Sequence, residues 1–74
     1  MTKLELKQIK KALKEGDLKI IAEVTKLHYQ TVQNVFRGDS PPRTRRDVVI
    51  QARLRLDANR KESEKAIKLI DKYV

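Results

Sequence analysis

Residues 17–38, DLKIIAEVTKLHYQTVQNVFRG, decide the fold of this chain. Their first part is expected to form a short helix over residues 18–24, because the carboxylate of Asp17 can face the free amides and the positive end of the helix dipole. Residues 25–27 carry no helix signal and predict a three-residue turn. A second helix is expected over residues 28–37, and the glycine that closes the stretch stops it. The side chains expected to point inward are Ile21, Ala22, Val32, Val35 and Phe36.

The chain before this stretch predicts a further helix over residues 3–15. Thr2 and Glu5 fit a capping box, in which each side chain satisfies the backbone amide of the other residue. Apolar side chains recur three and four residues apart, and lysines cover the remaining surface. Gly16 is expected to end this helix as a C-terminal cap. The inward residues are Leu6, Ile9, Ala12 and Leu13.

A fourth helix is expected after the proline pair at residues 41–42. Thr44 and Asp47 repeat the capping pattern with a shorter acid. Apolar residues at helical spacing then mark one face of this helix as buried. They are Val48, Val49, Ala52 and Leu56.

The C-terminal part leaves alternatives open. Asn59 ends the fourth helix and a fifth covers residues 61–73, or one helix continues from Val49 to Tyr73 as a heptad seam with polar residues, including Asn59, in its middle. The apolar stripe here, which reaches Val74, either folds back onto the core of the monomer or forms the seam of a homodimer. The residues expected to make that dimer contact are Ala66, Ile67, Ile70 and Tyr73.

The second helix of the deciding stretch has a polar outer face. The side chains free to point outward are His28, Tyr29, Gln30, Gln33, Asn34 and Arg37. Gln and Asn can pair bidentately with adenine, Arg can pair with guanine, and a Tyr ring can contact a thymine methyl group. Two short helices joined by a three-residue turn are the helix-turn-helix arrangement, which places the second helix in a DNA major groove. The sequence therefore predicts that this helix reads bases directly.

The same residues resemble a known family. IAE at residues 21–23 and LHYQTVQNV at residues 27–35 resemble the helix-turn-helix of the lac-repressor family, most closely in YQTV at residues 29–32. Thr44 and Arg45 followed by Val48 resemble the Thr-Arg-x-x-Val that opens the family's third DNA-binding helix. The resemblance covers residues 18–56. It implies base-reading positions for Tyr29, Gln30 and Asn34, and phosphate contacts for Thr31, Ser40 and Thr44.

Several features depart from that family. Lys26 stands where the family usually has a turn glycine, and Asn34 replaces an arginine often found at that position, so the target sequence should differ. The loop before Thr44 is shorter and the following apolar pattern has slipped by one residue. The sequence ends without the family's sugar-binding domain, and an additional helix precedes the motif. These last features resemble small phage repressors of the Cro kind, which are compact helical domains built around the same motif.

Two sets of DNA-contacting residues are predicted in total. Base reading is expected from Tyr29, Gln30, Gln33, Asn34 and Arg37. Phosphate contact is expected from His28, Thr31, Ser40, Arg43, Thr44, Arg45 and Arg46. Two of these residues have a structural alternative, because His28 can be a solvated cap residue and a cation such as Arg37 is favourable near a helix C-terminus without any ligand.

Charge is unevenly spread along the chain. Residues 1–14 hold five Lys against one Glu, and residues 26–58 hold one Lys and six Arg against three Asp, whereas residues 15–25 total −2. Three arginines cluster just before the expected fourth helix, where backbone amides also converge on a phosphate-sized anion. This predicts a contact with the DNA backbone. The alternative is a Lys-rich surface that is merely solvated.

Composition allows one small helical domain. The 74 residues carry a formal net charge of +8, and 39% are hydrophobic. A chain of this length buries only about 60% of its unfolded surface, so the core is expected to be thin. The apolar residues nevertheless fall in periodic stripes, which favours a folded protein. We expect an all-α fold, a compact four- to five-helix domain around the helix-turn-helix, with residues 1–58 binding DNA and residues 59–74 forming a C-terminal helix.

Several classes of chemistry are excluded. The chain has no cysteine, which removes disulfides, thiolate metal sites and cysteine nucleophiles. No enzyme is expected, because the only histidine lies on the proposed DNA face and no Ser-His-Asp spacing, Gly-rich phosphate loop or metal cluster is present. No cofactor and no small-molecule effector are expected. No apolar run approaches the roughly 18 residues that span a bilayer, so no membrane contact is expected.

The sequence favours one function and leaves one alternative. The favoured function is a sequence-specific transcriptional regulator, a repressor that binds an inverted repeat in double-stranded DNA as a homodimer, in the cytoplasm and on the nucleoid. The alternative is a helical protein-interaction module, such as an antitoxin or an adaptor.

Overall fold

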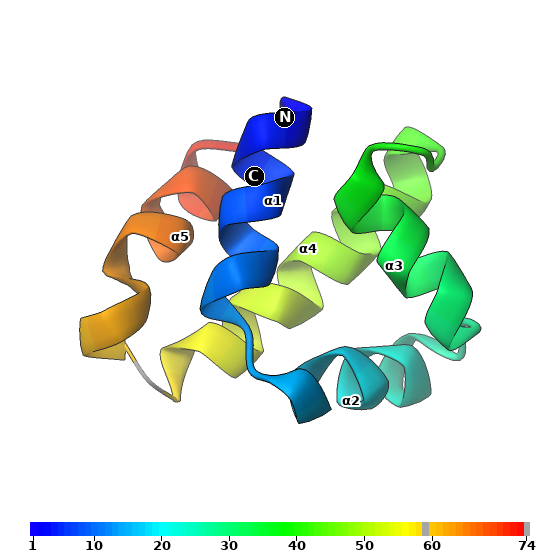
Figure 1. The fold of residues 1–74 in the computed structure, drawn as a ribbon, viewed down its shortest axis with the longest axis horizontal. Coiled ribbons are helices and arrows are strands. Elements are labelled where there is room, and N and C mark those ends of the chain that lie inside the picture. The colour runs from blue at the N-terminus through cyan, green and yellow to red at the C-terminus, as the bar shows by residue number, and fades with distance from the viewer. Residues whose placement is uncertain (59, 74) are drawn as a thin grey trace.

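Five α-helices make up the computed structural model, which describes residues 1–58 and 60–73. In chain order they are α1 (Lys3–Ala12), α2 (Glu15–Thr25), α3 (Tyr29–Arg37), α4 (Pro42–Asp57) and α5 (Arg60–Tyr73). Helix α4 runs through the middle of the molecule, with α5 towards one end of it and α3 towards the other (Figure 1). The predicted all-α fold is therefore confirmed, with five helices in the part of the chain described.

Helix α1 begins as predicted and ends early. The Thr2 amide donates to Oε1 of Glu5 at 3.0 Å and the Glu5 amide donates to Oγ1 of Thr2 at 3.2 Å, so the capping box is confirmed. Hydrogen bonding to Thr2, first through its amide, lowers the pKa of Glu5. The backbone becomes extended at Leu13 (φ −78°, ψ 145°), which stops α1 at Ala12.

The predictions that Gly16 caps α1 and that Asp17 caps the next helix are wrong. Gly16 lies in the first turn of α2, which begins at Glu15. Asp17 acts from inside that turn, because its Oδ2 accepts a hydrogen bond of 2.9 Å from the amide of Lys14, the residue before the helix. A carboxylate at the third helical position satisfies this amide as the acid of a capping box does, so the helix starts before the glycine.

The turn between α2 and α3 has three residues, as predicted, but it covers residues 26–28 and not 25–27, because Thr25 still belongs to α2 and α3 begins at Tyr29. Lys26 adopts the left-handed backbone conformation (φ 58°, ψ 32°). The Leu27 amide then donates back to the carbonyl oxygen of Ala22 at 3.0 Å, which closes the end of α2. His28 follows in extended conformation and is the N-cap of α3.

Helix α3 ends at Gly38, as predicted. Gly38 has φ 85°, and its amide donates to the carbonyl oxygen of Val35 at 3.0 Å, while the Asp39 amide donates to that of Asn34 at 3.0 Å. A side-chain carbon added to Gly38 would lie 2.8 Å from Cγ of Lys3. The stem of Lys3 therefore lies directly against the turn that ends α3.

Helix α4 begins before the position predicted for it. The expected capping box of Thr44 and Asp47 is wrong, because Thr44 already lies inside the helix and the N-cap is Pro41. Pro42 occupies the first helical position, where its fixed φ suits a helix and its missing amide hydrogen would have had no helical partner. The proline pair therefore starts this helix.

A single hydrophobic core joins all five helices. Every inward residue predicted above belongs to it, with Ala12 half-buried at its edge. Its buried members are Leu6, Ile9, Leu13, Leu18, Ile21, Ala22, Val32, Val35, Phe36, Val48, Val49, Ala52, Leu56, Ala66, Ile67 and Ile70.

The C-terminal helix packs on α1 and α4 of the same chain. Because α4 ends at Asp57 and α5 begins at Arg60, the continuous seam from Val49 to Tyr73 is wrong and the two-helix alternative is confirmed. Ala66, Ile67 and Ile70 are at most 4% exposed, so they fold back onto the monomer core and do not offer a dimer seam. Tyr73 is half-buried, and the expectations for Asn59 and Val74 lie outside the described residues.

Candidate nucleic-acid interface

Helix α3 turns one polar face to the surface. Its apolar residues fix this orientation, since Val32 and Val35 are fully buried and Phe36 is 3% exposed. The predicted base readers lie on the other side of the helix, where Tyr29, Gln30 and Arg37 are exposed and Gln33 and Asn34 are half-buried. The structure therefore brings all five onto one face of α3.

Two of these side chains are bonded to each other. Nε2 of Gln30 donates to Oδ1 of Asn34 at 3.2 Å, across one turn of α3. The bond uses one donor and one acceptor, so the Gln30 carbonyl oxygen and the Asn34 amino group keep their capacity for a ligand. The sequence reasoning missed this pair, although the spacing of four residues is the signal for it.

The predicted phosphate contacts fall into two groups. The exposed His28 and the half-buried Thr31 lie at the start of α3. The remaining residues lie in the loop after α3 and in the first turns of α4, and they are Ser40, Arg43, Thr44, Arg45 and Arg46. The first group therefore lies at the start of α3, and the second, apart from Thr44, follows the end of α3 along the chain.

The first turn of α4 offers backbone donors. The first hydrogen bond of this helix runs from the Arg45 amide to the carbonyl oxygen of Pro41 at 3.0 Å, so the amides of Arg43 and Thr44 have no partner within it. Arg43 and Arg46 are exposed and line a shallow hollow with Pro42 and Tyr73. A phosphate group here would meet free amides, the positive end of the helix dipole and two guanidinium groups.

Ser40 and Arg45 have buried polar atoms. Oγ of Ser40 and Nε of Arg45 are shielded from solvent and have no hydrogen-bond partner among the described residues. An unsatisfied buried donor or acceptor costs about 1–3 kcal/mol. Any contact between Arg45 and a phosphate would have to come from the rest of its guanidinium group.

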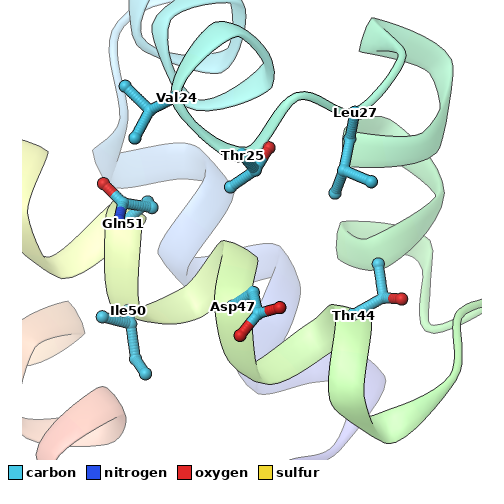
Figure 2. Close-up of a pocket in the computed structure, with 7 residues that line it drawn as sticks. All are labelled: Val24, Thr25, Leu27, Thr44, Asp47, Ile50 and Gln51. Atoms are coloured by element: carbon cyan, nitrogen blue, oxygen red, sulfur yellow. The ribbon is translucent and has the colours of Figure 1, made fainter.

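Thr44 lies apart from the other predicted phosphate contacts. It lines a hollow of about 250 Å³ beneath the turn between α2 and α3. Figure 2 shows Val24, Thr25 and Leu27 on one side of this hollow and α4 on the other. The α4 residues that line it are Thr44, Asp47, Ile50 and Gln51. Its volume lies below the roughly 300–1,000 Å³ of common ligand pockets.

Some arginines of α3 and α4 are in ion pairs with described side chains and others are not. Arg53 donates to both carboxylate oxygens of Asp71 at 2.5 and 3.2 Å and to Asp57 at 2.8 Å, and Arg55 lies 3.4 Å from Asp17. These carboxylates raise the pKa of Arg53, and Arg53 lowers that of Asp71. Among the described side chains, Arg37, Arg43, Arg45 and Arg46 are in no ion pair. Unneutralised arginines therefore gather around the end of α3 and the start of α4.

Neither a protein-family model, nor a curated protein, nor a solved structure matches this chain. None of the helices in the described ranges combines the length and the apolar character that crossing a membrane requires.

Proposed function

We propose that this protein binds specific sequences in double-stranded DNA and represses transcription, with α2 and α3 acting as a helix-turn-helix and α3 entering the major groove. The observation that carries the proposal is the outer face of α3, where the bonded amides of Gln30 and Asn34 stand beside Tyr29, Gln33 and Arg37. Amides and guanidinium groups match the donor and acceptor patterns of base edges.

Unpaired arginines support the proposal from a second direction. Arg43 and Arg46 are exposed next to the free amides of α4, close to the end of α3 in the chain. Contacts of this kind bind the sugar-phosphate backbone and fix the position of a recognition helix without reading sequence. The residues for reading and for positioning thus lie on neighbouring elements.

A homodimer on an inverted repeat is part of the proposal. The chain measures 29 Å along its longest axis, whereas half-sites one helical turn apart are separated by about 34 Å. One copy is therefore too short to place a helix in both half-sites. Such a dimer, on the nucleoid in the cytoplasm, would repress transcription by occluding a promoter.

The test begins with selection of bound sequences from a random duplex library at physiological salt. Gln30→Ala and Asn34→Ala should each lose about 1–3 kcal/mol at particular base pairs and keep their non-specific affinity. Gln8→Ala is the matched control, because it removes an exposed amide from α1 and should leave the selected sequence unchanged. Equal loss on every duplex would refute base reading by α3.

One observation favours the alternative function, a protein-interaction module. Val24 on α2 and Leu54 on α4 are 56% and 57% exposed, on two helices that pack against each other. A protein partner that covered both side chains would remove this apolar surface from water. This function predicts weak DNA binding and no enriched sequence in the selection.

A further inference from the structure

We infer that Lys3, Lys7 and Lys10 of α1 form a second DNA-backbone contact, alongside the recognition helix. The inference rests on the proposed function. It extends that function to α1, a helix that holds none of the residues predicted above to contact DNA. The ligand chemistry is the phosphodiester backbone of the same duplex, next to the bases that face α3.

The position of Lys3 ties this row to the recognition helix. Its Cγ and Cε would lie 2.8 and 3.1 Å from a carbon added to Gly38, so its stem crosses the end of α3. Gly38 follows Asn34 by four residues and Thr31 by seven, so these three positions lie along one side of α3. Lys3, which contacts Gly38, therefore lies next to the side of α3 that carries Thr31 and Asn34. Thr31 is one of the predicted phosphate contacts.

The rest of the row follows from helix geometry. Lys3, Lys7 and Lys10 are spaced four and three residues apart, so they share one face of α1. The opposite flank of α1 faces α5, because Glu5 shares a hollow with Lys72 and Leu69. The lysine row therefore lies on the α3 side of α1, and the acidic residue of this helix lies on the other.

The three ammonium groups are available to a ligand. Among the side chains that the structure describes, none of them is in an ion pair. Lys3 and Lys7 are exposed and Lys10 is half-buried. Uncompensated cations in a row beside a recognition helix match the charge of a DNA strand that borders the major groove.

A matched pair of triple variants tests the inference. Lys3→Gln, Lys7→Gln and Lys10→Gln remove the row, whereas Lys61→Gln, Lys65→Gln and Lys68→Gln remove three exposed lysines with the same spacing from α5, of which Lys68 lies 3.5 Å from the also exposed Glu64. Both triples lower the net charge from +8 to +5, and glutamine keeps the helix propensity of lysine. Helices α5 and α3 lie at opposite ends of the molecule (Figure 1).

The measurement is the affinity of the full chain for its selected duplex and for a scrambled duplex, by fluorescence anisotropy over a range of salt concentrations. The α1 triple should flatten the slope of log affinity against log salt by about 1 per lysine and weaken both duplexes by the same factor. The α5 triple should change the slope by less than 1. The double variant Lys7→Gln, Lys10→Gln keeps the packing of Lys3 on Gly38 and should show about two thirds of the effect, which serves if the triple fails to fold.

The outcomes separate the inference from the proposed function. Equal effects of the two triples would overturn the inference alone, since only total charge would then matter. A wild-type chain that binds no duplex would overturn the proposed function and the inference with it. Changed base preference in the α1 triple would also overturn the backbone contact, because it would show reading of sequence.

Discussion

Lys26 is the residue whose backbone conformation least suits its side chain. It is the one non-glycine residue with positive φ among those described, at 58°. The left-handed conformation costs an L-residue roughly 1–2 kcal/mol, part of which glycine gives back through its greater freedom in the unfolded chain. Lys26→Gly should therefore stabilise the protein by about 0.5–1 kcal/mol and raise Tm by roughly 2–8 °C in a thermal melt.

Gly38→Ala is the control for this prediction. Gly38 has the same kind of backbone conformation, and an added carbon would also meet Lys3 at 2.8 Å. This variant should lose roughly 1–2 kcal/mol. If both substitutions shifted Tm in the same direction, backbone strain would not be the cause of either change.

At the scale of the elements, Arg53 and Asp71 tie α4 to α5. Their hydrogen bonds lower the pKa of Asp71, so the ion pair adds stability above the ordinary pKa of an aspartate and loses it as pH falls through the lowered value. Asp71→Asn should reduce the urea midpoint at pH 7 and have little effect at pH 2.

The exposed pair of Lys68 and Glu64 is the control for this pH dependence. Its side chains are 76% and 68% exposed at 3.5 Å, so Glu64→Gln should leave the midpoint almost unchanged at either pH. A loss at pH 2 as large as that at pH 7 would show that Asp71→Asn disturbs packing and not the charge pair.

Helix α5 contributes to stability mainly through its buried side chains. Ile70 is fully buried, so Ile70→Ala should cost about 2–5 kcal/mol. Leu54→Ala on α4 removes a side chain that is 57% exposed and should change stability by less than about 1 kcal/mol. If α5 packs only within its own chain, Ile70→Ala should lower the urea midpoint by the same amount at low and at high protein concentration, whether or not the folded chain also dimerises through another surface.

Sequence periodicity predicts which helices form and which faces are buried, but not where every helix ends. Val32, Val35 and Phe36 could be assigned to the core because a helix buries residues at fixed spacing. The start of α2 could not be predicted from the sequence, because Asp17 can satisfy an amide from the cap position or from inside the first turn. The surface against which α5 packs could not be predicted either, since an apolar stripe can pack equally well on its own chain or on a second copy.

The candidate site shows the same division. The outward face of α3 follows from the burial of its apolar residues, so its five polar residues could be named from the sequence. The contact between Lys3 and Gly38 could not be predicted from the sequence, because the two residues lie far apart in the chain and meet only through the packing of α1 on α3.

For the whole molecule, size is the property that bears most on how it would bind DNA. An extent of 29 Å leaves a single copy unable to span two half-sites. We expect two chains on a duplex with an inverted repeat and one chain on a duplex with a single half-site, measured as the mass of each complex. One chain on both duplexes would remove the dimer from the proposal and leave base reading intact.

Charge is unevenly distributed along the chain. Residues 15–25 are net negative, whereas Arg37, Arg43 and Arg46, at the end of α3 and the start of α4, are in no ion pair with any side chain that the structure describes. The electric field of a polyanion orients a protein with such a charge distribution before the two make contact. Its association rate therefore exceeds that of randomly oriented collisions and falls as salt is added. Replacing Asp57 and Asp71, the carboxylates that pair with Arg53, would raise the net positive charge and so favour association with DNA. It would also leave a further cation unpaired away from the end of α3, which weakens the orienting effect. The two effects on the association rate would therefore oppose each other.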